Sequence, residues 1–125
     1  MKQNLDYCRS YPDTLLRKFL DRNEDVFKTL RRIALIRYCG VNYHPCVFAF
    51  VIPLDVISPQ FSPIRPKYIF AIYAKVPSRT LLYVSDEIFS DLSRAKEQSQ
   101  YYLNYFPLYA RLSRNIYRKH NESSL

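Results

Sequence analysis

The sequence predicts an α+β fold in which a small antiparallel sheet of three strands carries helices on one face. The first observation is a central block of apolar runs, rich in β-branched and aromatic residues and bounded by Pro and Ser, which is typical of strands. These runs are Cys46–Ile57, Tyr68–Val76 and Leu81–Val84. The second observation is that apolar residues recur at helical spacing on both sides of this block. The predicted order of elements is therefore α-α-β-β-β-α.

The first predicted helix begins at Ser10, which can cap it, and Asp13 can complete a capping box. Its apolar stripe is formed by Leu15, Leu16, Phe19 and Leu20. The second predicted helix has Asn23 as its cap and ends near Tyr38. Its apolar face consists of Val26, Phe27, Leu30, Ile33 and Ala34, and Lys28, Arg31 and Arg32 lie on the opposite side. Gly40, the single Gly of the chain, stands where a C-terminal cap belongs.

The central segments have different predicted environments. Cys46–Val51 alternates less between apolar and polar residues than a solvent-facing strand should, so both of its faces are expected to be buried. Ser58–Lys67 contains three Pro and is predicted to be a loop. Pro77–Arg79 is short enough to connect a β-hairpin.

The last predicted helix opens at Ser85–Glu87 and is kinked or broken at Pro107, because proline disrupts a helix interior. Before Pro107, one face collects Ile88, Phe89, Leu92, Ala95, Tyr102 and Leu103. After it, Arg111, Arg114 and Arg118 form a separate basic stripe at helical spacing. Because no repeat or linker interrupts the chain, residues 1–125 are expected to form one domain with flexible ends at 1–10 and 121–125.

The charge of the chain points to a polyanionic partner. Nineteen Lys and Arg stand against eleven Asp and Glu, a formal net charge of +8. A surplus this large in a small protein favours nucleic acid first, and an acidic membrane or acidic protein second, although it can also serve solubility alone. Between Val56 and Ser85 there is no acidic residue. The cations of that stretch are therefore expected to form one positive region; they are Arg65, Lys67, Lys75 and Arg79.

The expected compartment is the cytoplasm or the nucleus. No apolar run approaches the roughly 20 residues that span a bilayer, so no transmembrane segment is predicted. The first ten residues lack the apolar core of a secretion signal. Three Cys make an odd number, which argues against a disulfide framework and fits a reducing compartment.

The cysteines suggest a zinc site. Cys39, His44 and Cys46, with Cys8 as the fourth ligand, would form the Cys₃His set that tetrahedral zinc accepts. The alternative is that Cys46 is a small buried apolar residue and that the other thiols are incidental. Apart from this candidate, the sequence predicts no cofactor.

Arg114, Asn115 and His120 resemble the signature of HEPN ribonucleases. In that family, an Arg and a His act on the RNA phosphate and the 2′-hydroxyl, usually across a dimer. The resemblance implies a metal-independent ribonuclease in which Arg114 and His120 are catalytic. It covers seven residues, and the HEPN fold is all helical. The alternative is a basic helix end, where cations are favourable.

The predicted order α-β-β-β-α from the second helix onward is similar to that of double-stranded-RNA-binding domains. Ser93–Lys96 is similar to the basic start of that family's second helix, although the Gly-rich turn that precedes it there has no counterpart. The similarity is an analogy of order rather than a family assignment.

We expect a small, non-enzymatic accessory protein that binds nucleic acid, with RNA preferred over DNA because Tyr can stack on unpaired bases. The expected phosphate-binding residues are Arg111, Arg114, Arg118 and Lys119, with Arg65, Lys67 and Arg79. The first alternative is a protein-interaction or inhibitor module that binds an acidic partner or forms a homodimer, since Tyr and Arg are enriched at interfaces. The second alternative is the ribonuclease that uses Arg114 and His120.

Overall fold

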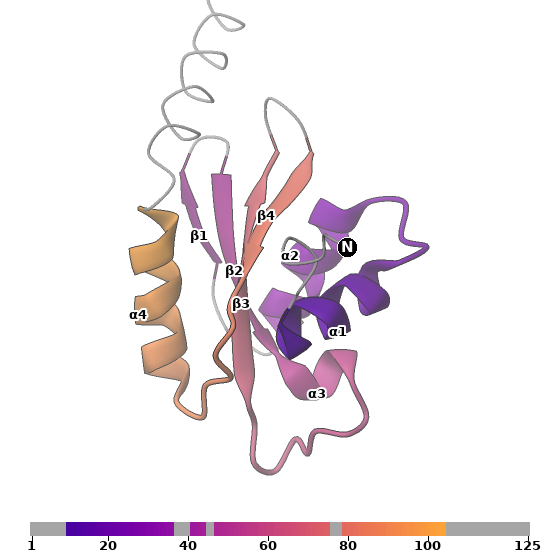
Figure 1. The fold of residues 1–125 in the computed structure, drawn as a ribbon, viewed down its shortest axis with the longest axis vertical. Helices are drawn as coiled ribbons and strands as arrows, with labels where there is room; N and C mark the ends of the chain where they lie inside the picture. Colours follow the sequence, from indigo (N-terminus) through magenta and orange to yellow (C-terminus); the bar gives the residue numbers. More distant parts are fainter. Residues whose placement is uncertain (1–9, 37–40, 45–46, 76–78, 105–125) are drawn as a thin grey trace, which may run out of the picture.

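A computed structural model describes residues 10–36, 41–44, 47–75 and 79–104 of the chain (Figure 1). Its helices are α1 (Tyr11–Leu20), α2 (Val26–Ile36), α3 (Leu54–Ile57) and α4 (Leu92–Leu103), and its strands are β1 (Val41–His44), β2 (Val47–Pro53), β3 (Tyr68–Ala74) and β4 (Thr80–Val84). The strands form one antiparallel sheet in the order β1-β2-β3-β4. The predicted α+β class with an antiparallel sheet is confirmed.

The two central strands are apolar on both faces. In β2 every residue from Val47 to Pro53 except Phe48 is buried. In β3 every residue from Ile69 to Ala74 is buried. Phe50 and Ile52 of β2 belong to a core cluster with α1 and α2, whereas Val47, Ala49 and Val51 belong to a cluster with α4. The alternation follows from the two-residue period of a strand. The expectation that this strand is buried on both faces is therefore confirmed.

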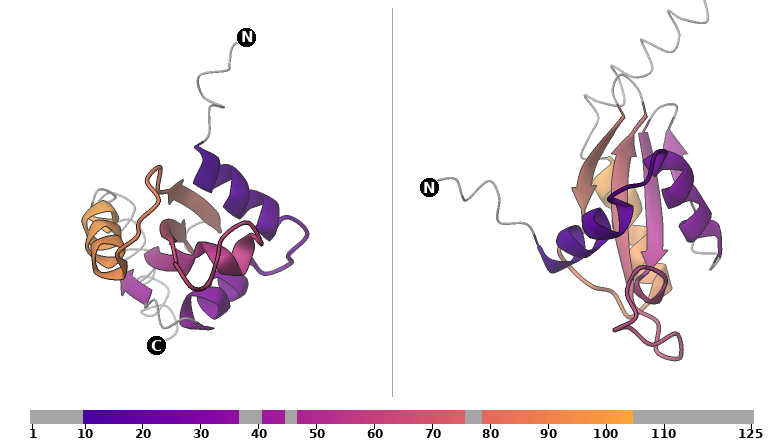
Figure 2. Two further views of the ribbon diagram at one scale, coloured as in Figure 1. Left: turned by 90° about the horizontal axis from the view of Figure 1, so that it is seen from below. Right: turned by 90° about the vertical axis from the view of Figure 1, so that its right-hand side faces the viewer.

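Helices cover both faces of the sheet, which corrects the prediction of one covered face. Figure 1 shows α4 on one side of the sheet and α1, α2 and α3 on the other, and the view from below in Figure 2 shows the same three layers. The physical reason is that β2 and β3 have no polar face to present to water, so an uncovered side would expose apolar area.

The sheet has four strands, where the sequence predicts three. β1 pairs with β2, with Asn42 opposite Ala49. Its sequence, VNYH, is short and half polar, so it does not show the apolar run that identifies the other strands. The predicted hairpin is present, because β3 and β4 pair antiparallel across residues 75–79.

The apolar run from Cys46 to Ile57 is also interrupted by a turn of helix. β2 ends at Pro53 and α3 follows at once, and the Leu54 N–H donates to the Lys67 carbonyl at 2.8 Å. Proline cannot extend the ladder of hydrogen bonds, which explains why the strand stops there. The predicted loop Ser58–Lys67 connects α3 to β3.

One of the two capping residues predicted for α1 and α2 is confirmed and the other is wrong. At α1 the Ser10 hydroxyl accepts the Asp13 N–H at 3.2 Å, as the sequence predicts. At α2 the cap is Asp25 rather than Asn23, because the Asp25 carboxylate accepts the Lys28 N–H at 3.0 Å. The Asn23 side chain instead donates to the Phe19 carbonyl and so closes the preceding turn.

The start of α4 also differs from the prediction. The helix begins at Leu92 with Asp91 as its cap, not at residues 85–87. Ser85 accepts the Phe70 N–H instead, and the Phe89 and Tyr68 backbones exchange two hydrogen bonds of 2.8 Å. These bonds hold residues 85–89 beside the sheet and compete with helix formation.

Several predictions fall on residues that the structure does not describe, namely the cap at Gly40, the break at Pro107, and the chain ends at 1–9 and 121–125. None of the helices that the structure does describe combines the length and the apolar character needed to cross a bilayer.

Candidate functional site

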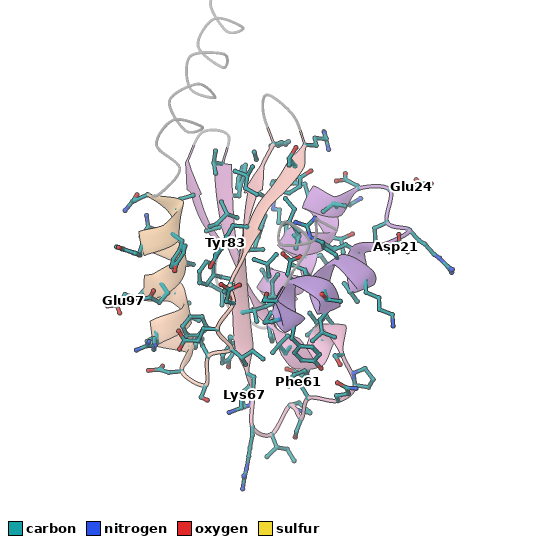
Figure 3. The ribbon with its side chains drawn as sticks, in the orientation of Figure 1. Asp21, Glu24, Phe61, Lys67, Tyr83 and Glu97 are labelled. Atoms are coloured by element: carbon teal, nitrogen blue, oxygen red, sulfur yellow. The ribbon has the colours of Figure 1, made fainter. Side chains whose placement is uncertain are left out.

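Three of the predicted phosphate-binding residues lie in the described part of the chain, and they do not lie together. Arg65 and Lys67 lie in the loop that precedes β3, and Arg79 lies at the far end of the β3–β4 hairpin. The seven residues of β3 lie between the loop and the hairpin, and a strand of this length is on the order of 20 Å long. Figure 3 shows Lys67 at the lower end of the sheet, away from the hairpin. The cations between Val56 and Ser85 therefore form two separate basic regions instead of the single one predicted.

The partners of these three residues also differ. Lys67 donates its Nζ to the Ser90 hydroxyl at 2.8 Å. The Arg79 guanidinium lies 3.8 Å from the Asp25 carboxylate. Arg65 is exposed and forms no ion pair within the part of the chain that is described.

The other predicted site residues lie outside the described ranges. These are Arg111, Arg114, Arg118, Lys119 and His120 of the basic C-terminal segment, and Cys8, Cys39 and Cys46 of the zinc set. His44 lies in β1, but its side chain is not described. Among the described residues, no three His, Cys, Asp or Glu side chains are grouped to hold a metal ion.

The exposed face of α2 carries a group of cations that sequence reasoning did not select as a site. Lys28, Arg31 and Arg32 are exposed and follow one another at i, i+3 and i+4, which places them on one face of the helix. The core residues Phe27, Leu30, Ile33 and Ala34 occupy the opposite face. We call Lys28, Arg31 and Arg32 the α2 cation face.

Neither an ion pair within the described residues nor a position at the C-terminal end of the helix accounts for these three cations. Within the described residues, none of the three takes part in an ion pair. Cations stabilise the C-terminal end of a helix, yet Lys28 lies in the first turn of α2 and Arg31 and Arg32 lie in its middle. The first turn of α2 itself holds no acidic residue, and the Asp25 cap that precedes it pairs with Arg79 rather than with the Lys28 side chain.

Lys75 adds a positive charge beside α2, but over the core-facing residue Phe27 rather than on the α2 cation face. Lys75 follows β3 directly, and its Nζ lies 4.6 Å from the centre of the Phe27 ring. A cation over an aromatic ring at an exposed site is stabilised by about 0.5–1 kcal/mol. Phe27 lies directly before Lys28 in α2, so this contact brings Lys75 from the sheet to the same end of the molecule.

A cleft of about 280 Å³ lies where the end of α1, the start of α2 and the β3–β4 hairpin meet. We call it the α1–α2 cleft. Its polar lining consists of Arg17, Asp21, Tyr73 and Arg79, and its apolar lining consists of Leu20, Val26 and Leu81. In Figure 3, Asp21 is labelled at the end of α1, on the side of the molecule opposite α4.

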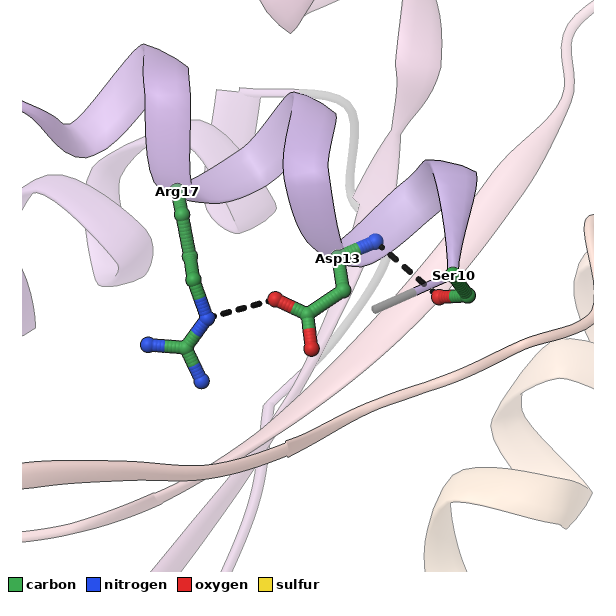
Figure 4. Close-up of polar contacts among 3 residues, drawn as sticks. All are labelled: Ser10, Asp13 and Arg17. Carbon is green, nitrogen blue, oxygen red and sulfur yellow. Dashed lines mark hydrogen bonds and ion pairs between the residues drawn. The ribbon is translucent and has the colours of Figure 1, made fainter. Parts of the chain in front are cut away.

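Two cations of the α1–α2 cleft have carboxylate partners. Arg17 donates its Nε to the Asp13 carboxylate within α1 (Figure 4). Arg79 pairs with Asp25, and this pair is largely exposed. Burial raises the pKa of the Tyr73 phenol, and the nearby Arg79 charge lowers it in part while Asp25 raises it. Tyr73 is therefore a neutral hydroxyl at physiological pH.

On the other face of the sheet, Tyr83 and Tyr102 stack with ring centres 5.0 Å apart. Burial, the charge of Asp86 and a hydrogen bond with Tyr102 raise the pKa of Tyr83 to about 12. A phenol this weakly acidic is not a general base at neutral pH. The aromatic group is therefore a packing unit between β4 and α4.

Comparisons with protein-family models, with curated proteins and with solved structures found no match for this chain.

Proposed function

We propose that the protein is a small non-enzymatic nucleic-acid-binding protein that prefers RNA over DNA and contacts the phosphate backbone with the α2 cation face. The observation that carries the proposal is that Lys28, Arg31 and Arg32 are exposed on one helix face with no carboxylate partner among the described residues. Unpaired cations grouped on a helix are the usual donors to phosphates, and they release counterions when they bind.

The overall charge supports this proposal and favours a second contact with nucleic acid outside the described residues. The described residues carry twelve Lys and Arg and nine Asp and Glu, so most of the surplus of +8 lies elsewhere in the chain. The segment 105–125 alone contributes Arg111, Arg114, Arg118 and Lys119 against a single Glu. These four residues remain our proposed second contact with the backbone.

The proposed preference for RNA is supported by two partly exposed aromatic side chains. Tyr101 of α4 and Tyr11 of α1 are about half exposed, at 54% and 52%. Exposed aromatic rings can stack on the unpaired bases of single-stranded RNA.

The test is a salt titration of binding to fluorescently labelled single-stranded RNA, duplex RNA and duplex DNA. We expect log K to fall linearly with log salt, with a slope of about −0.7 per phosphate contact for single strands. The triple variant Lys28→Gln, Arg31→Gln, Arg32→Gln should reduce the magnitude of that slope by roughly 2.

The matched control removes the same amount of positive charge from exposed positions outside the α2 cation face. Lys18→Gln, Arg22→Gln, Lys96→Gln changes three exposed cations on α1, the α1–α2 turn and α4, and it should leave the slope almost unchanged. An equal loss in both triple variants would contradict a site on α2. No retention of RNA or DNA at low salt would rule out the function itself, and capture of polyglutamate instead would favour the acidic-protein alternative.

The ribonuclease alternative is tested on the same samples. If RNA is shortened during the titration, His120→Ala should abolish the cleavage, and unchanged cleavage would exclude the catalytic role of Arg114 and His120.

A further inference from the structure

We propose that Ser62 is a phosphorylation site for a proline-directed serine/threonine kinase that also requires a cation three residues after the acceptor hydroxyl. Ser62 is followed directly by Pro63, and Arg65 stands three residues after it. Proline-directed kinases select proline directly after the acceptor, and kinases distinguish their substrates by complementary charge. The site lies outside the α2 cation face and does not depend on nucleic-acid binding.

The first observation is that the whole recognition segment is accessible. Ser62, Pro63, Ile64 and Arg65 are all exposed, and the Ile64 side chain reaches 87%. Figure 1 shows the loop 58–67 projecting beyond α3 at the lower end of the molecule. A kinase can therefore approach the acceptor hydroxyl and the residues that follow it without displacing another element.

The second observation is that this part of the loop has few backbone contacts to lose. The loop is closed at its end, where the Leu54 N–H donates to the Lys67 carbonyl at 2.8 Å. Within the described ranges, no hydrogen bond joins the backbone of residues 62–66 to the backbone of another segment. The Ile64 N–H donates locally, to the Ser62 hydroxyl at 3.1 Å. The segment can therefore extend into the groove of a kinase at little cost in backbone hydrogen bonds.

The third observation is a second Ser-Pro pair in the same loop that lacks these properties. Ser58 precedes Pro59, but it is only 5% exposed. Its N–H donates to the Leu54 carbonyl at 2.9 Å, and its carbonyl accepts the Phe61 N–H at 3.3 Å. The residue three positions after Ser58 is Phe61, which packs against the core instead of offering a cation. Ser58 is therefore an internal control with the same dipeptide.

The reaction takes its phosphoryl group from Mg·ATP. The Ser62 hydroxyl oxygen attacks the γ-phosphorus, the bond from that phosphorus to ADP breaks, and the hydroxyl proton passes to the catalytic carboxylate of the kinase. The product carries a charge of about −2 at neutral pH. Arg65, which has no ion pair among the described residues, can bind this phosphate through its guanidinium. Phosphorylation thus offsets the two positive charges of Arg65 and Lys67.

The test is incubation of the purified full chain with a cyclin-dependent kinase bound to its cyclin and with Mg·[γ-³²P]ATP, followed by mass spectrometry of the peptides. We expect phosphate on Ser62. The variant Ser62→Ala should abolish the incorporation, and Ser58→Ala should leave its rate unchanged. No incorporation into the natural chain, incorporation at Ser58, or an undiminished rate in Ser62→Ala would each overturn the proposal.

A second pair of variants tests the cation. Arg65→Gln should lower kcat/KM for the phosphorylation about tenfold, because it removes the charge that the kinase binds. Lys96→Gln is the matched control, since it removes an exposed cation of α4, and it should leave kcat/KM unchanged. Circular dichroism confirms that both variants are folded. An Arg65→Gln chain that is phosphorylated as fast as the natural chain would overturn the proposed class of kinase.

Discussion

At the scale of single residues, Arg22 shows the consequence of having one Gly in 125 residues. It follows the C-cap of α1 and adopts a left-handed backbone with φ of 74°. Most helices place Gly or Asn at such a position, because a side chain there costs roughly 1–2 kcal/mol. The chain therefore stores backbone strain at the α1–α2 turn, next to the cleft.

Arg22→Gly should stabilise the protein by about 0.5–1 kcal/mol. The variant relieves the left-handed strain, and the greater entropy of Gly in the unfolded chain offsets part of the gain. Urea denaturation with an unchanged slope measures the difference. The control is Lys18→Gly in exposed α1, which should cost about 1 kcal/mol. Similar losses in both variants would contradict strain at Arg22.

Tyr83 should make the folded state sensitive to alkaline pH. Its pKa is about 12 in the folded protein against 10.0 for the ordinary phenol. Between these values the unfolded chain has lost the proton and the folded chain keeps it, so stability falls as the pH rises from about 10 to about 12. Denaturation midpoints measured across this window should fall less for Tyr83→Phe than for the natural chain. If Tyr11→Phe, at an exposed tyrosine, reproduces the effect of Tyr83→Phe, the assignment is wrong.

At the scale of elements, the start of α2 links local structure to the hairpin. Asp25 caps the helix through the Lys28 N–H and also pairs with Arg79 before β4. The pair is exposed at both ends, so its contribution is small, whereas a helix cap is worth about 1 kcal/mol.

Asp25→Ala should therefore cost about 1 kcal/mol, and Asp25→Asn should cost less than about 0.5 kcal/mol. Asparagine keeps the oxygen that accepts the backbone N–H and removes only the charge. Thermal or urea unfolding of the two variants side by side makes the comparison. A loss in Asp25→Asn as large as that in Asp25→Ala would show that the ion pair, not the cap, holds the start of α2.

The elements that were predicted correctly share a local cause. The cap at Ser10 and the apolar stripe of α1 lie within a few residues of one another, and so do the alternating apolar positions of β2 and β3. The errors at Asn23 and at Ser85–Glu87 arose where two polar residues competed for one role. Thr29 and the Phe19 carbonyl engage Asn23, and the Phe70 N–H engages Ser85. The partners of Asn23 lie four and six residues away in the sequence, whereas the partner of Ser85 lies 15 residues away in β3 and follows only from the packing of the sheet.

At the scale of the whole molecule, the sheet separates two apolar layers. Phe50 faces α1 and α2 and is fully buried, and Phe70 faces α4 and is 1% exposed. Phe70 has the rings of Tyr83, Phe89 and Tyr102 within 6.0 Å. Both layers should therefore contribute to one cooperative core.

Phe50→Ala and Phe70→Ala should each cost about 3–5 kcal/mol, because each leaves a cavity in a packed layer. Phe61→Ala, in the half-exposed loop after α3, should cost clearly less. Urea midpoints with circular dichroism to confirm folding provide the measurement. A cost for Phe70→Ala no larger than that for Phe61→Ala would show that the α4 layer adds little to the core.

The class of the fold, the two central strands, the loop with three prolines and the surplus of positive charge could all be predicted from the sequence. These depend on composition and on periods of two or 3.6 residues, which are visible along the chain. Only the tertiary structure showed that β1 completes the sheet and that α4 covers its second face. It alone showed that Lys67 and Arg79 lie at opposite ends of β3 and that Lys75 lies over the Phe27 ring of α2. The reason is that contacts between distant segments follow from the packing of layers, and packing depends on every element at once.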